Sequence, residues 1–258
     1  MSERSECTRV IAWDPAQYHR YADERSRPFA ELLTRVGAVS PRYVVDLGCG
    51  SGELTALLAQ RWPEALVEGV DSSAEMLAQA PAGARLSFTL ADIRTWRPVR
   101  SADVVVSSAA LQWVDGHEQV LREFIGALAA DGWLAVQVPG NFAADSHRLL
   151  RDVAARWVPE LTLRTDPVLD PTGYFALLAA EGLQVDAWET TYLQVLPGED
   201  PVLEWVKGTA LRPVLAALAP GRQPAFLAEY GAALRAAYPG GSAGTLFPFR
   251  RVFAVGHR

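Results

Sequence analysis

The sequence predicts an α/β protein in which helices pack on both faces of a mostly parallel sheet. An apolar run at residues 43–45 leads through an acid into a glycine-rich turn at residues 48–52, and an apolar-periodic helix follows. Residues 66–70 and 86–90 are two further apolar runs, each with an acid at or just after its end. Residues 103–108 contain three consecutive valines, as expected of a buried parallel strand. Such repetition of strand, tight turn and helix is typical of a doubly wound sheet.

The remainder of the chain continues this pattern with one interruption. We expect strands at 133–138, 185–196 and 247–256, and helices at 27–36, 117–130, 145–158 and 171–181. Residues 197–245 break the alternation with two helical stretches, 201–218 and 223–238. The sequence therefore predicts one domain over residues 1–258, with a helical insertion or cap at 197–245 before the last strand. Residues 12–36 form an aromatic N-terminal segment, which either packs on the sheet edge or folds over the active site as a lid.

Composition excludes several classes of protein. A net charge of −6 and the absence of a basic stripe argue against nucleic acid as the main partner. Two cysteines and four scattered histidines indicate neither a disulfide framework nor a metal site. No apolar run approaches the ~20 residues that a membrane span needs, and residues 1–9 lack a signal-peptide core, so we expect a cytoplasmic protein with no membrane partner. All but one of the 24 basic residues are arginine, which binds carboxylates with two parallel hydrogen bonds.

The glycine turn narrows the choice of ligand. A dinucleotide fingerprint requires glycine three positions after its second glycine, where this chain has Glu53, so NAD and FAD are disfavoured. The phosphate-binding loop G-x-x-x-x-G-K-[ST] does not occur. The turn D-L-G-C-G-S-G (46–52) closely resembles that of the class I S-adenosylmethionine (SAM) methyltransferases.

Acids at the ends of successive strands are candidates to bind one such molecule. Asp71 follows the turn by about 20 residues, where an acid accepts hydrogen bonds from ribose hydroxyls, although it could also cap the next helix. Asp92 could accept from an adenine amino group, with Ile93 over the ring. Gln112 and Trp113 should border a sulfonium, to which an aromatic face is attractive, unless Trp113 is simply part of the core. The predicted cofactor-binding residues are Asp46, Gly48, Gly50, Gly52, Asp71, Ser72, Met76, Asp92, Ile93, Ala109, Gln112 and Trp113.

With these residues assembled, the chain is similar to the trans-aconitate methyltransferase branch of the class I family. The likeness also depends on W-D-P-x-x-Y (13–18), E-R-S-R-P (24–28), G-V-D-S-S (69–73), A-D-I-R-T-W (91–96), L-Q-W (111–113), L-A-V-Q-V-P (134–139), T-T-Y (190–192), A-L-R-P (210–213) and F-P-F-R-R (247–251). The resemblance implies a sheet of about seven strands with the last one antiparallel. It also implies SAM as methyl donor, S-adenosylhomocysteine (SAH) as product, and one carboxylate of trans-aconitate as acceptor, giving a monomethyl ester. Ser51 and Glu53 depart from the family's pattern, and Glu53 is expected to point away from the cofactor.

Methylation of a carboxylate needs no general base, because the group is already ionised at neutral pH with a reference pKa of about 4. We therefore expect no catalytic residue in the strict sense, and a polycarboxylate held by arginines. The predicted substrate-binding residues are Tyr18, Tyr21, Arg25, Arg27, Gln112, Trp113, Arg212, Phe247, Arg250 and Arg251. The alternatives are a methyltransferase acting on another small molecule and a non-catalytic SAM-binding protein; an NAD-dependent oxidoreductase is more distant.

Overall fold

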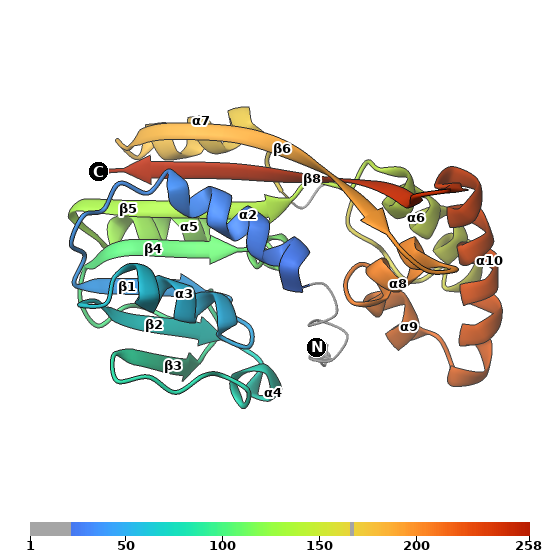
Figure 1. Cartoon of the computed structure of the whole chain (residues 1–258), viewed down its shortest axis with the longest axis horizontal. Helices are drawn as coiled ribbons and strands as arrows, with labels where there is room; N and C mark the ends of the chain where they lie inside the picture. The colour runs from blue at the N-terminus through green and yellow to red at the C-terminus, as the bar shows by residue number, and fades with distance from the viewer. Residues whose placement is uncertain (1–21, 166–167) are drawn as a thin grey trace, which may run out of the picture.

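A twisted sheet forms the centre of the computed structural model, which describes residues 22–165 and 168–258 (Figure 1). The strands are β1 (Tyr43–Leu47), β2 (Leu66–Asp71), β3 (Leu86–Leu90), β4 (Ala102–Ser108), β5 (Leu128–Pro139), β6 (Gln184–Leu196), β7 (Gly240–Gly241) and β8 (Gly244–His257). Their order is β3-β2-β1-β4-β5-β8-β6, and the two-residue β7 pairs only with β8. Strands β1 to β5 are parallel, whereas β8 runs antiparallel to both neighbours. The predicted fold class, a mostly parallel sheet with an antiparallel last strand, is confirmed.

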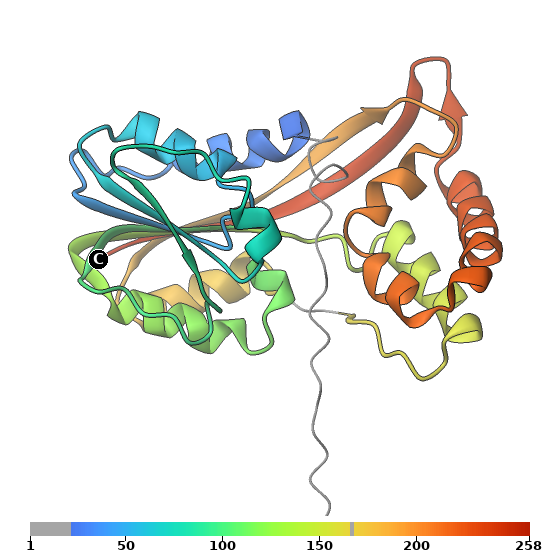
Figure 2. The same ribbon diagram turned by 90° about the horizontal axis from the view of Figure 1, so that it is seen from below.

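Helices cover both faces of this sheet. They are α2 (Ala22–Thr34), α3 (Glu53–Arg61), α4 (Ala74–Leu77), η1 (Leu111–Trp113), α5 (His117–Gly126), α6 (Asp145–Trp157), α7 (Pro171–Ala180), α8 (Pro201–Lys207), α9 (Arg212–Ala217), η2 (Pro220–Arg222) and α10 (Gln223–Ala237). Helices α2 and α3 lie on one face, and α5 and α7 lie on the other (Figure 2). Phe29 and Leu58 are fully buried in the first layer, and Phe124 and Tyr174 in the second.

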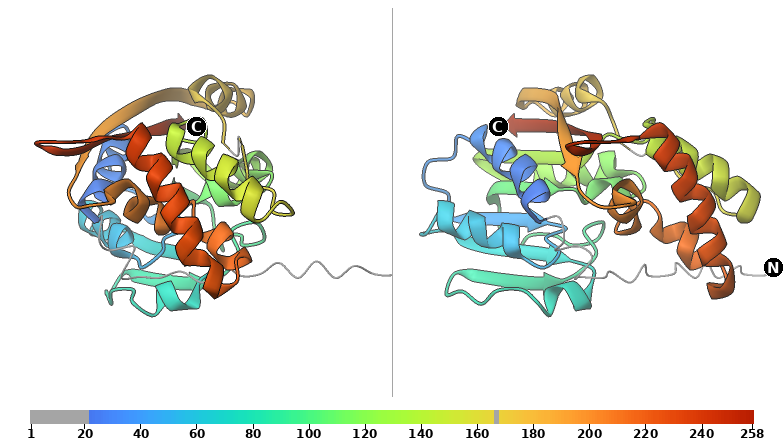
Figure 3. Two further views of the ribbon diagram at one scale, coloured as in Figure 1. Left: turned by 90° about the vertical axis from the view of Figure 1, so that its right-hand side faces the viewer. Right: turned by 45° about the vertical axis from the view of Figure 1, so that its right-hand side comes forward.

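A second group of helices lies beyond the carboxyl ends of the parallel strands. Helices α6, α8, α9 and α10 gather around the outer halves of β6 and β8 (Figures 1 and 3). They share a core that includes Trp205, Phe226 and Tyr230, and the Tyr230 hydroxyl donates to the Ser146 carbonyl at 2.7 Å. Helices α8 to α10 fall within the predicted insertion, and α6 packs with them although it precedes the insertion in the chain. In the described ranges, no helix combines the length and apolar character needed to cross a bilayer.

Three helix predictions differ clearly from the structure. The helix expected over 27–36 begins at Ala22 and ends at Thr34. The helix expected over 117–130 ends at Gly126, and Leu128 pairs with Ala102 as the first residue of β5. The apolar spacing continued to Leu128 because this strand residue is buried in the same core cluster as Phe124. The stretch 201–218 divides into α8 and α9, and the break between them brings residues 209 and 210 to the cavity described below.

Candidate functional site

The glycine turn joins β1 to α3 and is held against the end of β2. The backbone N–H groups of Gly48 and Cys49 donate to the Val70 carbonyl at 2.8 and 3.1 Å. Gly48 has φ of +74°, and a Cβ placed on it would lie 2.2 Å from Cβ of Ala110. Both the backbone conformation and the available space therefore require glycine here. The turn is packed between the end of β2 and the segment that follows β4.

Asp71 connects the end of β2 to this turn. Its carboxylate accepts hydrogen bonds from the backbone N–H of Gly50 at 2.8 Å and of Ser73 at 2.9 Å. Ser73, and not Asp71, caps α4, since its hydroxyl accepts from the Met76 N–H at 3.2 Å. Asp71 is half-buried, and a carboxylate can accept about four hydrogen bonds, so capacity for ribose hydroxyls remains. Its ribose role stays a prediction, whereas its role in fixing the turn is structural.

Asp46 lies beneath the turn and not on an open surface. Its side chain is 2% exposed and accepts a hydrogen bond from the Thr55 hydroxyl at 2.6 Å. Burial raises the pKa of Asp46 to about 7, and the charge of Asp71 acts in the same direction, while the Thr55 hydrogen bond opposes them. The structure therefore places Asp46 as a support of the turn and does not place it on the cavity wall.

Asp92 lies at the end of β3, beside the end of β2, where the Ala91 N–H donates to the Asp71 carbonyl at 2.9 Å. Its carboxylate accepts from both the backbone N–H and the Nε of Arg94, at 2.9 and 3.0 Å. The hydrogen bond with Arg94 holds the pKa of Asp92 below its usual range, although burial opposes it. Ile93 is 7% exposed and packs in the core. Arg94 is thus a neighbour of the predicted adenine contact that the sequence pattern did not indicate.

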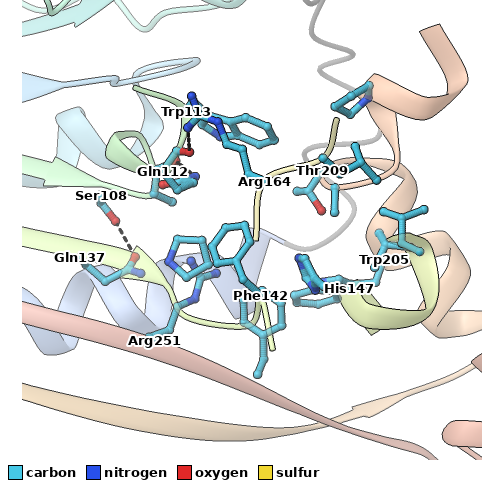
Figure 4. Close-up of a pocket in the computed structure, with 18 of the residues that line it drawn as sticks. Ser108, Gln112, Trp113, Gln137, Phe142, His147, Arg164, Trp205, Thr209 and Arg251 are labelled. Carbon is cyan, nitrogen blue, oxygen red and sulfur yellow. Dashed lines mark hydrogen bonds between the residues drawn. The ribbon is translucent and has the colours of Figure 1, made fainter. Parts of the chain in front are cut away.

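A cavity of about 150 Å³ opens between the sheet and the second helix group (Figure 4). A single water molecule needs ~10–15 Å³ of such space, so the cavity has room for a small molecule. It lies at the carboxyl ends of β4 and β5, where doubly wound sheets bind ligands. Its polar lining comprises Ser108, Gln112, Trp113, Gln137, His147, Arg151, Arg164, Thr209 and Arg251. Among the described residues, no Asp or Glu lines it.

A strained corner after β4 forms one wall of the cavity. Ala109 has φ of +56° and is the only non-glycine residue with a positive φ among the described residues. Strained backbone of this kind is concentrated at functional sites. Its carbonyl accepts from Gln112 Nε2 at 2.6 Å, and its N–H donates to the Gln137 carbonyl at 2.8 Å. Gln112 is 6% exposed, and its Oε1 has no donor among the described residues. Trp113 lies on the cavity wall and not in the core.

Of the predicted substrate arginines with described side chains, Arg251 alone lines the cavity. Arg250 instead pairs with Glu189, its Nε donating at 2.9 Å. Arg27 stacks over the Tyr192 ring with its guanidinium carbon 4.8 Å from the centroid. Arg212 begins α9 without lining the cavity.

Of the other predicted substrate residues, Gln112 and Trp113 line the cavity and Phe247 does not. Phe247 is 1% exposed and packs edge-on against Trp205 at 5.8 Å between ring centroids. Tyr18 and Tyr21, and the side chain of Arg25, lie outside the described residues.

Sequence reasoning missed two cavity arginines. Arg151 projects from α6, and its Nη1 donates to the Phe142 carbonyl at 2.8 Å. Arg164 follows α6; its Nη1 donates to the Gln112 carbonyl at 2.7 Å, and it also pairs with Asp115. One available signal was that His147 and Arg151 are four residues apart, so they share one face of the predicted helix.

The electrostatics of the cavity are dominated by these arginines. Burial lowers the pKa of His147 to about 4, and the nearby charge of Arg151 contributes to the shift, so the imidazole is neutral at pH 7. The cavity is also lined by three arginines, Arg151, Arg164 and Arg251. The cavity therefore suits a small anion with several carboxylates.

The residues beside the cavity also fit SAM. The glycine turn gives a backbone surface that any Cβ would alter, with the Asp71 carboxylate next to it. The buried Gln112 Oε1 is an acceptor suited to a cationic group. The glycine turn lies next to the cavity, because Gly48 contacts Ala110 and the preceding residue, Ala109, lines the cavity.

Comparisons with known proteins agree with this chemistry. A family model described as a methyltransferase domain matches residues 44–132. A protein of Streptomyces avermitilis named trans-aconitate 2-methyltransferase is 54% identical, over 96% of this chain and 98% of that protein. A Rhodococcus jostii protein with the same name is 52% identical, over 94% of this chain and 98% of that protein.

Solved structures share the fold at low sequence identity. Haemonchus contortus phosphoethanolamine N-methyltransferase 2, in complex with SAM, has a TM-score of 0.56 at 16% identity, covering 89% of this chain and 52% of that chain. Coclaurine N-methyltransferase, bound to N-methylheliamine and SAH, has a TM-score of 0.53 at 15% identity, covering 90% and 72%.

Proposed function

The chain belongs to the trans-aconitate 2-methyltransferases, SAM-dependent enzymes of the class I fold, and we propose that it forms a monomethyl ester on one carboxylate of trans-aconitate. SAH is the second product. The observation that carries the proposal is the cavity at the carboxyl ends of β4 and β5, which three arginines line and no described carboxylate enters. These cations suit a tricarboxylate acceptor, and one of them, Arg164, also pairs with Asp115 outside the cavity lining.

SAM supplies an electrophilic methyl group attached to a positively charged sulfur. The turn residues Gly48, Gly50 and Gly52, together with Asp71, would hold it, and Gln112 and Trp113 would border its reactive end. An aromatic face beside a cation contributes ~0.5–2 kcal/mol, which Trp113 can provide.

The protein's task on the acceptor side is binding and orientation. A carboxylate is ionised at pH 7, so no residue has to remove a proton from it. His147 is not required as a base, in keeping with a neutral ring packed edge-on against Phe142 at 5.3 Å. Arg151 on α6, Arg164 in the segment after it and Arg251 on β8 would hold the acceptor. Orientation of two reactants contributes ~7–11 kcal/mol in favourable cases.

Exclusion of water from the cavity strengthens these charge interactions. Its apolar lining includes Phe142, Leu150, Trp205 and Phe249, contributed by both the sheet and the second helix group. The sheet and the second helix group therefore both contribute apolar surface beside the arginines.

A direct test measures ester and SAH formation with a panel of acceptors: trans-aconitate, cis-aconitate, citrate, a dicarboxylate and the trimethyl ester of trans-aconitate. We expect turnover with trans-aconitate and none with the triester, with SAM binding followed independently by titration calorimetry. If the protein binds SAM and methylates a different acid but not trans-aconitate, that acid is the substrate. SAM binding with no turnover at all would favour a non-catalytic SAM-binding protein. A cytoplasmic location stays a prediction.

A further inference from the structure

Gln137 is a buried polar residue in the middle of an apolar strand. It is 1% exposed, and its neighbours Val136 and Val138 on β5 are equally buried. Polar side chains in such positions normally have all their hydrogen bonds satisfied, and an exception calls for an explanation. Gln137 lines the cavity, and its two neighbours on the strand are both apolar.

The amide of Gln137 is hydrogen-bonded to Ser108 on the adjacent strand β4. The Ser108 hydroxyl donates to Gln137 Oε1 at 3.1 Å (Figure 4). The Nε2 group is then left as the donor, and it has no acceptor among the described residues. A buried N–H donor that borders a cavity suits an oxygen atom of a ligand.

A comparison with Gln112 shows that the two cavity amides have opposite polarity. Gln112 donates its Nε2 hydrogen to the Ala109 carbonyl and leaves Oε1, an acceptor, unused by the described residues. Gln137 accepts through Oε1 and leaves Nε2, a donor. An unused hydrogen-bond acceptor repels a carboxylate and attracts a cation, whereas an unused hydrogen-bond donor attracts a carboxylate and repels a cation. The negatively charged methyl acceptor, trans-aconitate, is therefore expected on the side of the cavity where Gln137 lies.

Arg251 reinforces this assignment. Gln137 pairs with Phe253 across β5 and β8, and Arg251 lies two residues from Phe253 on the same face. Diagonal neighbours of this kind are within reach of long side chains. Figure 4 shows Gln137 and Arg251 on the same side of the cavity.

We propose that Gln137 Nε2 donates a hydrogen bond to a carboxylate of the acceptor, and that Ser108 is a positioning residue that keeps this donor facing the cavity. The inference rests on the proposed function, since it concerns how trans-aconitate is held. In this proposal, Gln137 and Ser108 take part in recognising trans-aconitate together with the arginines.

The test uses Gln137→Met, which keeps length and removes the donor without adding charge. We expect kcat/KM for trans-aconitate to fall ~10–100-fold, the usual range for a lost hydrogen bond to a charged group. The affinity for SAH should change less than about threefold. The rise in melting temperature that trans-aconitate produces in the presence of SAH should disappear, which is a readout independent of turnover. Gln119→Met, on the exposed face of α5, is the matched control and should behave as wild type.

A double-mutant cycle tests the role of Ser108. Ser108→Ala alone should lower kcat/KM, and Ser108→Thr, which restores the hydroxyl, should recover most of it. In the Gln137→Met background, Ser108→Ala should have no further effect, because its target is already gone. Additive losses would show a merely structural role for Ser108 and overturn that part of the proposal.

The outcome for Gln137 is equally decisive. Folded Gln137→Met protein with kcat/KM within threefold of wild type overturns the inference, as does a parallel loss of SAH affinity, which would place the amide on the cofactor. The wild-type reaction tests the proposed function separately. Failure of the wild type to methylate trans-aconitate removes that function, whereas failure of the variants to differ removes only this assignment.

Discussion

Arg250 and Arg251 are consecutive on β8, yet their side chains serve opposite faces of the sheet. Arg251 is 6% exposed, lines the cavity, and has its guanidinium carbon 4.7 Å from the centroid of the Phe249 ring. Arg250 pairs with Glu189 on β6 and donates to the Gly140 carbonyl at 3.3 Å. Side chains alternate along a strand, so a pair of adjacent arginines provides one for the cavity and one for the outer surface.

This pair gives a matched experiment. We expect Arg251→Gln to lower kcat/KM for trans-aconitate by ~10–100-fold, mainly through KM, because it removes a charge-assisted hydrogen bond. Arg250→Gln should change the same quantity less than about threefold, since it breaks a surface ion pair worth about 0–1 kcal/mol. Steady-state kinetics with SAH affinity measured in parallel distinguishes the two. Equal effects of both variants would contradict the assignment of Arg251.

Helix α6 offers a second matched pair. Arg151→Gln should raise the KM for trans-aconitate by about tenfold, because Arg151 lines the cavity. Arg148, three residues earlier, is exposed and pairs with Asp145 at 2.8 Å and Asp152 at 3.4 Å. Arg148→Gln should therefore leave KM unchanged. The idea fails if Arg151→Gln has the KM of wild type.

The glycine turn predicts a difference between two alanine substitutions. Gly182 has φ of +83°, and a Cβ placed on it would meet nothing within 4 Å, so Gly182→Ala should cost only the conformational strain of ~1–2 kcal/mol. Gly48→Ala adds a 2.2 Å contact with Ala110 and should cost more than about 3 kcal/mol and abolish SAM binding. Denaturant unfolding and calorimetry measure both effects. Similar stabilities of the two variants would show that the turn relaxes around Ala110.

His147 should make stability depend on pH. Its folded pKa of about 4 lies below the reference value of 6.5, so between these values the unfolded chain binds more protons than the folded chain. The free energy of unfolding should therefore fall as pH drops from 6.5 to 4, by about 2 kcal/mol from this group after allowance for its partial exposure. His147→Gln should flatten that part of the profile. A variant whose unfolding profile runs parallel to wild type across this window would refute the assignment.

The sequence was sufficient to locate the seven longer strands because their signals are local, although β5 begins at Leu128 and not at Trp133, and β7 was not predicted. The valine run of β4 and the turn after β1 needed no knowledge of distant residues. The ends of helices were harder, since Leu128 continues a helical spacing while belonging to β5. Leu128 belongs to a strand because it pairs with Ala102, and this long-range pairing cannot be read from the spacing of apolar residues.

The cavity was predicted only in part, for a different reason. Its arginines come from α6, the segment after it and β8, and they meet only once the second helix group packs beyond the sheet. Apart from the four-residue spacing of His147 and Arg151, nothing along the chain distinguished Arg151 and Arg164 from the other arginines. Gln137 did leave a signal, as a lone amide in an apolar strand, and its meaning needed the partner on β4.

The long pairing of β6 with β8 has a mechanical consequence. Thirteen consecutive residue pairs connect these strands, from Gln184 with His257 to Leu196 with Thr245. Phe249 and Arg251 lie within this ribbon, between the sheet that carries Gln137 and the helix α8 that carries Trp205. A continuous antiparallel ladder therefore joins the two walls of the cavity, and the curvature of this strand pair sets the distance between them.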